Sequence, residues 1–124
     1  MMTFEIIMGI PEMEKLWNNL VSKKTYGTLT QNEALLFKKL AKAFKMLSNN
    51  PMHPGLHSHK IDDLSRRYNA EVWQSYLENH TPKAGRLYWV YGPRRNTITI
   101  IGVEQHPENK NNSYSKVELS DMPS

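Results

Sequence analysis

Three of the five histidines lie in the short segment 53–60, at His53, His57 and His59. Residues two apart on a strand project from the same face, so the sequence predicts that His57 and His59 lie side by side. Two adjacent imidazoles can exchange protons with a substrate, contact RNA or take part in a metal site. A zinc site would need a third ligand, for which His53, Glu104 and His106 are the candidates. The alternative is a pair of half-exposed strand histidines packed on aromatic neighbours.

Arg86 and His106 form a second candidate pair. Arg86 opens one predicted hairpin strand and His106 closes the next, so an antiparallel hairpin would bring both to the same edge of the sheet. A guanidinium is suited to planar binding of a phosphate, and an imidazole can give or take a proton near neutral pH. The alternative is an ordinary surface ion pair for Arg86 and a strand-end position for His106.

The remaining basic residues have weaker claims to function. Arg94 and Arg95 lie in the predicted hairpin turn, at the far end from Arg86, and two further arginines lie in a predicted loop at positions 66 and 67. The lysines at 38, 39, 42 and 45 share one face of a predicted helix. That face is either a solvated amphipathic surface or a surface that follows an RNA backbone. Aromatic residues could stack on unpaired bases, and their spacing leaves open which do so: Trp73, Tyr76, Tyr88, Trp89 and Tyr91.

Composition limits the chemistry further. The 124 residues contain no cysteine, which excludes disulfides, thiolate zinc sites and cysteine nucleophiles. The net charge of +4 hides an uneven distribution, because residues 15–60 hold eight lysines against the single acid Glu33. No stretch approaches the ~20 apolar residues of a membrane span. The first residues lack the layout of a signal peptide, so we expect a cytoplasmic protein that contacts no membrane.

The elements that must position these side chains follow from periodicity. Residues 3–8 alternate as a short strand, and a helix is expected from Pro11 to just before Gly27. Thr30 and Glu33 form a capping-box pattern that opens a second helix, which ends at residues 49–51. Its apolar side chains gather on one arc, opposite the lysines.

The second half of the chain has the pattern of strands. Residues 56–61 and 70–77 are predicted strands joined by the polar stretch 62–69, and residues 81–83 are predicted as a turn. Residues 86–91 and 97–103 are the strongest strands, joined as a hairpin by residues 92–96. We therefore expect an α+β fold with two N-terminal helices on one face of a mostly antiparallel, four- to five-stranded sheet. Residues 1–107 form the single domain, and residues 108–124 a polar, mobile tail.

Three segments together resemble a known family. They are residues 50–60 (NPMHPGLHSHK), residues 72–79 (VWQSYLEN), and the hairpin 85–91 (GRLYWVY) with 97–106 (TITIIGVEQH). In this order they resemble the RelE/YoeB/YafQ-like toxins of type II toxin–antitoxin systems, in the RelE/ParE superfamily. The resemblance covers most of residues 3–107. In place of the aromatic residue that several members carry near the terminal histidine, this chain has Pro107 and Glu108.

The resemblance implies a RelE-like fold and a bacterial endoribonuclease that cleaves mRNA, usually on the ribosome, and so inhibits translation. The RNA 2′-hydroxyl is the nucleophile, so no metal or cofactor is needed. Arg86 matches the arginine that contacts the phosphate, and His106 matches a general acid or base. His57, His59 and Lys60 lie where the family places further polar site residues. Phosphate contacts are also expected from the basic residues outside this group: Arg94, Arg95, Lys38, Lys42 and Lys45.

The expected protein partner is a cognate antitoxin, an acidic segment that folds on binding, and the lysine-faced helix is a candidate dock for it. Two other functions stay open. One is a non-nucleolytic toxin of the same superfold, such as a ParE-like gyrase inhibitor, which Arg86 together with His106 argues against. The other is a binding module that has kept the fold and lost the activity.

Overall fold

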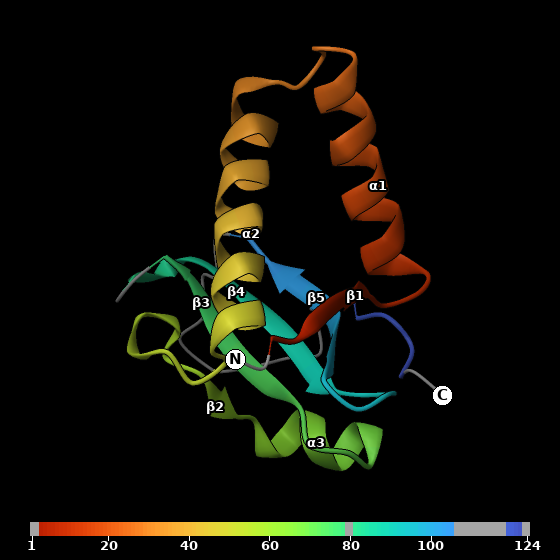
Figure 1. Ribbon diagram of the computed structural model, residues 1–124, viewed down its shortest axis with the longest axis vertical. Helices are drawn as coiled ribbons and strands as arrows, with labels where there is room; N and C mark the ends of the chain where they lie inside the picture. Colours follow the sequence, from red (N-terminus) through yellow and green to blue (C-terminus); the bar gives the residue numbers. More distant parts are fainter. Residues whose placement is uncertain (1–2, 79–80, 106–118, 123–124) are drawn as a thin grey trace.

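The computed structural model describes residues 3–78, 81–105 and 119–122 of the chain (Figure 1). These residues form an α+β fold with three α-helices and a mixed five-stranded sheet. The elements in chain order are β1 (Glu5–Met8), α1 (Glu12–Thr25), α2 (Gln31–Asn49), the 3₁₀ helix η1 (Pro54–Leu56), β2 (His59–Lys60), α3 (Asp62–Tyr68), β3 (Trp73–Glu78), β4 (Thr81–Tyr91) and β5 (Thr97–Glu104).

The strands lie in the order β1-β5-β4-β3-β2. The first strand, β1, runs parallel to β5, whereas the other three pairings are antiparallel. The register shifts within β4–β5 between Tyr88 and Trp89, and within β3–β4 between Tyr76 and Glu78. At the far edge, β2 pairs only with Trp73 and Gln74. Among the residues that the structure describes, the later part of β3 therefore has no strand partner on that side.

The two N-terminal helices form a hairpin that rises from one face of the sheet (Figure 1). The predicted capping box is confirmed, because the Thr30 hydroxyl accepts from the Glu33 amide and the Glu33 carboxylate accepts from the Thr30 amide. Both predicted boundaries are close to those observed, since α1 begins after Pro11 and α2 ends at Asn49. Among the described residues, no helix is long and apolar enough to cross a lipid bilayer.

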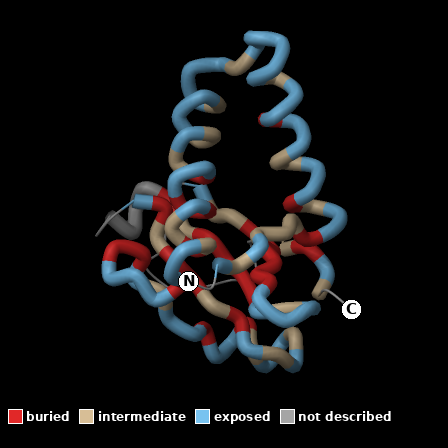
Figure 2. Tube along the Cα trace, viewed as in Figure 1, coloured by how far each residue is buried: buried red, intermediate tan, exposed pale blue. Residues whose placement is uncertain are grey.

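The sheet is covered on both faces. On one face, α1 and α2 pack against Leu87, Trp89, Ile98 and Ile100, and Trp17 stacks on Phe37 with ring centroids 5.1 Å apart. On the other face, α3 packs against a smaller apolar cluster: Ile61, Leu64, Val72, Tyr88, Val90 and Ile101. Figure 2 shows the buried residues gathered at the sheet and the adjoining turns of the helices, while the connection between α1 and α2 is exposed.

Three expectations for the second half were wrong. The polar stretch 62–69 is the helix α3, because Asp62 and Asp63 suit its first turn and Arg66 and Arg67 suit its last. Only Leu64 of this helix is buried, so no apolar periodicity marks it in the sequence. The strand predicted at 56–61 is reduced to the two residues of β2, after η1. Residues 81–83, predicted as a turn, are the start of β4.

Residues 119–122, expected in the polar tail, return to the body of the molecule. Ser120 is fully buried, and its hydroxyl oxygen accepts a hydrogen bond of 2.9 Å from the Met13 amide in the first turn of α1. The Ser120 amide donates to the Ile101 carbonyl, and the Asp121 amide donates to the Ile10 carbonyl. Gly9 leaves the space for this segment, because a Cβ there would lie 2.7 Å from the Ser120 Cβ.

Candidate active site

The turn between α2 and β2 carries the histidine cluster. His53 caps the N-terminal end of the 3₁₀ helix η1, and its Nδ1 accepts a hydrogen bond of 2.9 Å from the Gly55 amide. His57 caps the C-terminal end and adopts the left-handed conformation with φ of 50°. His59 then enters β2. His57 is thus not part of a strand, so the predicted strand alternation does not explain how the two histidines are arranged.

A chain of hydrogen bonds through the hydroxyls of Ser58 and Ser75 and the indole of Trp89 fixes this turn. The Ser58 hydroxyl donates to the Pro51 carbonyl at 2.7 Å, and the Ser58 and Ser75 oxygens are also 2.7 Å apart. Since the Ser58 proton is already used, Ser75 donates to Ser58 and in turn accepts from the Trp89 indole at 2.8 Å. Ser75 is fully buried, so the turn is anchored to the core while His57 and His59 stay exposed.

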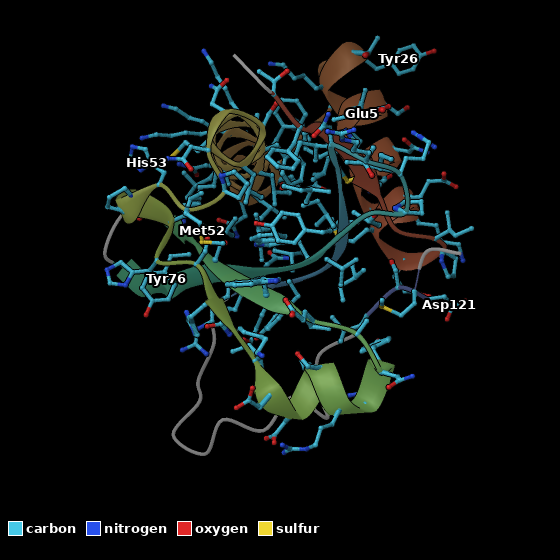
Figure 3. The ribbon with its side chains drawn as sticks, turned by 60° about the horizontal axis from the view of Figure 1, so that its bottom comes forward. Glu5, Tyr26, Met52, His53, Tyr76 and Asp121 are labelled. Atoms are coloured by element: carbon cyan, nitrogen blue, oxygen red, sulfur yellow. The ribbon has the colours of Figure 1, made fainter. Side chains whose placement is uncertain are left out.

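Tyr76 of β3 brings the two histidines together. Its ring stacks on the His57 imidazole at 5.0 Å with an interplanar angle of 12°, and it meets the His59 ring edge-on at 6.4 Å. Figure 3 shows Tyr76 at the side of the molecule where η1 and His53 stand. His59 Nδ1 lies 2.8 Å from the His57 carbonyl oxygen. A carbonyl only accepts, so Nδ1 carries the proton and Nε2 of the neutral ring keeps a lone pair for a base.

The strand register links Tyr76 to Arg86. Tyr76 is the cross-strand partner of Arg86, and Arg86 is the partner of Glu104. Directly opposed residues share a face of the sheet, so these three side chains form a row across β3, β4 and β5. A second row beside it is hydrogen-bonded, because Gln74 donates to the Tyr88 hydroxyl and that hydroxyl donates to Glu104, both at 3.0 Å.

The Arg86 side chain is largely buried, but not all of its N–H donors have a hydrogen-bond partner among the described residues. Its side chain is 14% exposed, and its Nη1 lies 3.9 Å from the Glu104 Oε1, which is long for a hydrogen bond. Its Nε is buried and has no hydrogen-bond partner among the described residues. A guanidinium whose carboxylate partner is this distant can turn its terminal N–H donors to an arriving anion with little loss of conformational entropy.

The other predicted site residues lie apart from this cluster. Lys60 follows His59 in β2 and borders a shallow hollow with Asp62 and Arg66. Arg94 lies in the hairpin turn at the other end of β4, where its Nη2 is 3.2 Å from a Glu5 carboxylate oxygen, and Arg95 is its neighbour.

On α2, Lys38 and Lys42 line a groove that reaches Tyr76, whereas Lys45 is exposed outside that lining. His106 lies outside the described residues, so its predicted meeting with Arg86 stays a prediction.

Two important members of the site could not be selected from the sequence. Tyr76 was one of five aromatic candidates, and only the folded turn between α2 and β2 shows that it contacts both histidines. Glu104 was considered as a metal ligand, but it lies opposite Arg86 and accepts from Tyr88. The sequence indicates only that Glu104 lies near the end of a predicted strand. Its pairing with Arg86 could not be predicted, because the register between β4 and β5 depends on a bulge. Within the described ranges, no three His, Asp or Glu side chains are grouped closely enough to hold a metal ion.

Comparison of the chain with models of protein families, with curated proteins and with solved structures finds no match.

Proposed function

We propose that the chain is an endoribonuclease of the RelE-like toxin type, which cleaves mRNA on the ribosome and is held inactive by a cognate antitoxin. One observation carries the proposal. The exposed imidazoles of His57 and His59 share the ring of Tyr76, and Tyr76 is the direct cross-strand neighbour of Arg86. A base, a stacking surface and a phosphate-binding cation thus occupy neighbouring positions.

The reaction uses groups that these residues supply. His59 Nε2 takes the proton of the ribose 2′-hydroxyl, and the 2′-oxygen bonds to the adjacent phosphorus. The Arg86 guanidinium stabilises the negative charge added at the phosphate. The bond from phosphorus to the 5′-oxygen breaks, and that oxygen leaves with a proton from a general acid, for which His106 is the candidate. The products are a 2′,3′-cyclic phosphate and a 5′-hydroxyl, and the ribose itself supplies the nucleophile.

The test is induction of the chain in bacterial cells, followed by mapping of new 5′-hydroxyl ends in mRNA. We expect such ends in translated messages. Arg86→Gln should lower cleavage by about 10²–10³-fold through loss of a charged donor, and His59→Ala by about 10²–10⁴-fold through loss of the base. Arg66→Gln is the matched control, because Arg66 is an exposed arginine on α3 that pairs with Asp63.

Continued translation without new ends would overturn the proposal. Growth arrest without new ends, unchanged by Arg86→Gln, would instead indicate the non-nucleolytic branch of the superfold. Full cleavage by both site variants would leave the class standing and remove the residue assignment.

A further inference from the structure

Arg86 and Glu104 form an ion pair whose charged groups do not come into contact. The two residues are directly opposed in the register of β4 and β5, where side chains of this length can reach each other. Their side chains are 14% and 19% exposed, so this pair is the best shielded from water of the ion pairs among the described residues. Shielding strengthens the attraction between opposite charges. Even so, their separation of 3.9 Å is the longest of these pairs.

The Tyr88 hydroxyl explains this separation. Tyr88 lies two residues after Arg86 on β4, so both side chains project from the same face of the sheet. Its own cross-strand partner is Gly102, which has no side chain, and the Tyr88 hydroxyl reaches the diagonal neighbour Glu104 instead. It donates at 3.0 Å to the same Oε1 that is nearest to Arg86. The Glu104 carboxylate is thereby held toward Tyr88 and away from contact with the guanidinium.

Gln74 fixes the direction of this hydrogen bond. Its Nε2 donates to the Tyr88 oxygen at 3.0 Å, so the single proton of the hydroxyl is directed to the Glu104 carboxylate, which can only accept. Gln74 is 3% exposed, and Tyr88 is fully buried in the cluster that packs against α3. Neither side chain can turn into solvent, and together they hold Glu104 in place.

The position of the carboxylate satisfies two opposing needs of Arg86. A largely buried guanidinium without any negative charge nearby is costly, because it has lost much of its hydration. A carboxylate in full contact would compensate that cost, but it would also use the N–H donors that a phosphate needs. At 3.9 Å the Glu104 carboxylate still compensates the charge and leaves the donors available.

We propose that Glu104 competes with the substrate phosphate for Arg86, and that Tyr88 limits this competition by holding the carboxylate away. The inference rests on the proposed function, in which Arg86 contacts the phosphate, and it concerns how strongly that contact forms. Glu104 lowers the affinity, because its negative charge repels an arriving phosphate. Tyr88 is a positioning residue, since it is fully buried and acts on the phosphate only through Glu104.

The experiment measures binding of a fluorescent single-stranded RNA of ten nucleotides by anisotropy at one salt concentration. Every ribose of the probe carries a 2′-O-methyl group, which blocks the nucleophile and leaves binding as the only readout. Glu104→Gln keeps an oxygen that accepts from Tyr88 but removes the charge. It should bind the probe about tenfold more tightly, the lower end of what one charge at about 4–6 Å does to an ionisation equilibrium.

Tyr88→Phe should have the opposite effect and weaken binding several-fold, because the released carboxylate can then move into contact with Arg86. The same substitution leaves Gln74 without its acceptor, so weaker binding alone would not separate competition from a damaged fold. The double variant Tyr88→Phe/Glu104→Gln separates them. We expect it to bind as tightly as Glu104→Gln, since no carboxylate is left for Tyr88 to hold.

The matched control is Asp63→Asn, which also removes one negative charge beside an arginine, Arg66, but on the exposed surface of α3. It should change the affinity by less than about twofold, because exposed ion pairs are screened by solvent and salt. A second control combines Glu104→Gln with Arg86→Gln. The gain from Glu104→Gln should be lost there, because the phosphate is no longer held beside residue 104.

The results distinguish this inference from the proposed function. If the parent protein does not bind the probe, or if Arg86→Gln binds it as the parent does, both proposals are overturned. If Arg86→Gln weakens binding but Glu104→Gln strengthens it no more than Asp63→Asn does, only the competition is overturned. The same holds if Tyr88→Phe weakens binding equally with Glu104 or glutamine at position 104. If all binding results are as expected but cells show no new 5′-hydroxyl ends, the competition stands and the cleavage proposal is overturned.

Discussion

Arg86 differs from the other arginines of the β4–β5 hairpin in how far its position is fixed before any ligand arrives. Its side chain is 14% exposed and lies between Tyr76 and Glu104 in the strand register, whereas that of Arg94 is 65% exposed on the turn. A side chain that is already ordered loses less conformational entropy when it binds. For this reason we rank Arg86 above Arg94 as the group that would contact the phosphate in the proposed reaction.

Ser75 has an equally local role that can be tested through stability. Ser75→Ala removes the acceptor of the buried Trp89 indole N–H and the donor to Ser58. A buried donor left without a partner costs about 1–3 kcal/mol. We therefore expect the free energy of unfolding, measured by urea denaturation, to fall by that amount. Because Ser58 anchors the turn that carries His57 and His59, the proposed RNA cleavage should also be slower in the folded variant.

A matched change on the surface is Ser22→Ala, because Ser22 is exposed on α1. It should alter stability by less than about 0.5 kcal/mol. Equal stability of Ser75→Ala and the parent protein would contradict the role given to this hydrogen-bond chain.

At the scale of elements, the start of α2 depends on ionisation. The pKa of Glu33 is lowered from 4.5 to about 2, mainly by the hydrogen bond from Lys23 and then by the backbone of Thr30. A lowered pKa in the folded state means stability that is present above pH 4.5 and is lost as the pH falls toward 2. Glu33→Gln should therefore be less stable than the parent protein at pH 7, and the difference should shrink between pH 4.5 and 2.

Urea denaturation at a series of pH values checks this expectation. Lys23→Met should reduce the same pH dependence, because Lys23 is the largest cause of the lowered pKa. A difference between Glu33→Gln and the parent protein that stays constant from pH 7 to pH 2.5 would contradict it.

The same scale shows how much of the fold could be predicted from the sequence. The helix α2 was predictable because its capping box and its apolar arc agree, and the β4–β5 hairpin because β-branched and aromatic residues flank a turn. The helix α3 was not predictable, since only Leu64 of its seven residues is buried. The 3₁₀ helix η1 replaced a predicted strand because Pro54 and Gly55 fit a tight turn.

For the candidate site, the residue pattern singled out the histidines and Arg86 but not their neighbours. The contacts of Tyr76 depend on the left-handed backbone of His57, and the place of Glu104 depends on a bulge at Tyr88. Both are set by tertiary packing, which periodicity does not record.

At the scale of the whole molecule, β1 and the start of α1 meet segments from the far end of the described chain. The parallel pairing joins Glu5 to Thr97, and Ser120 then completes the first turn of α1 by accepting from Met13. Ser120→Ala leaves that buried amide without its partner, so we expect the free energy of unfolding to fall by about 1–3 kcal/mol. Thermal unfolding of the variant checks this, and an unchanged melting temperature would contradict it.

This closure has a consequence for the order in which the molecule can be made. A ribosome releases β1 and α1 first, yet β1 finds its strand partner only after residues 97–100 have been synthesised, and the N-terminus of α1 only after residue 120. Until then the apolar sides of the first helices lack the sheet that they cover, as in any fold dominated by distant pairings. Assembly of the finished sheet must therefore wait until β5 has left the ribosome.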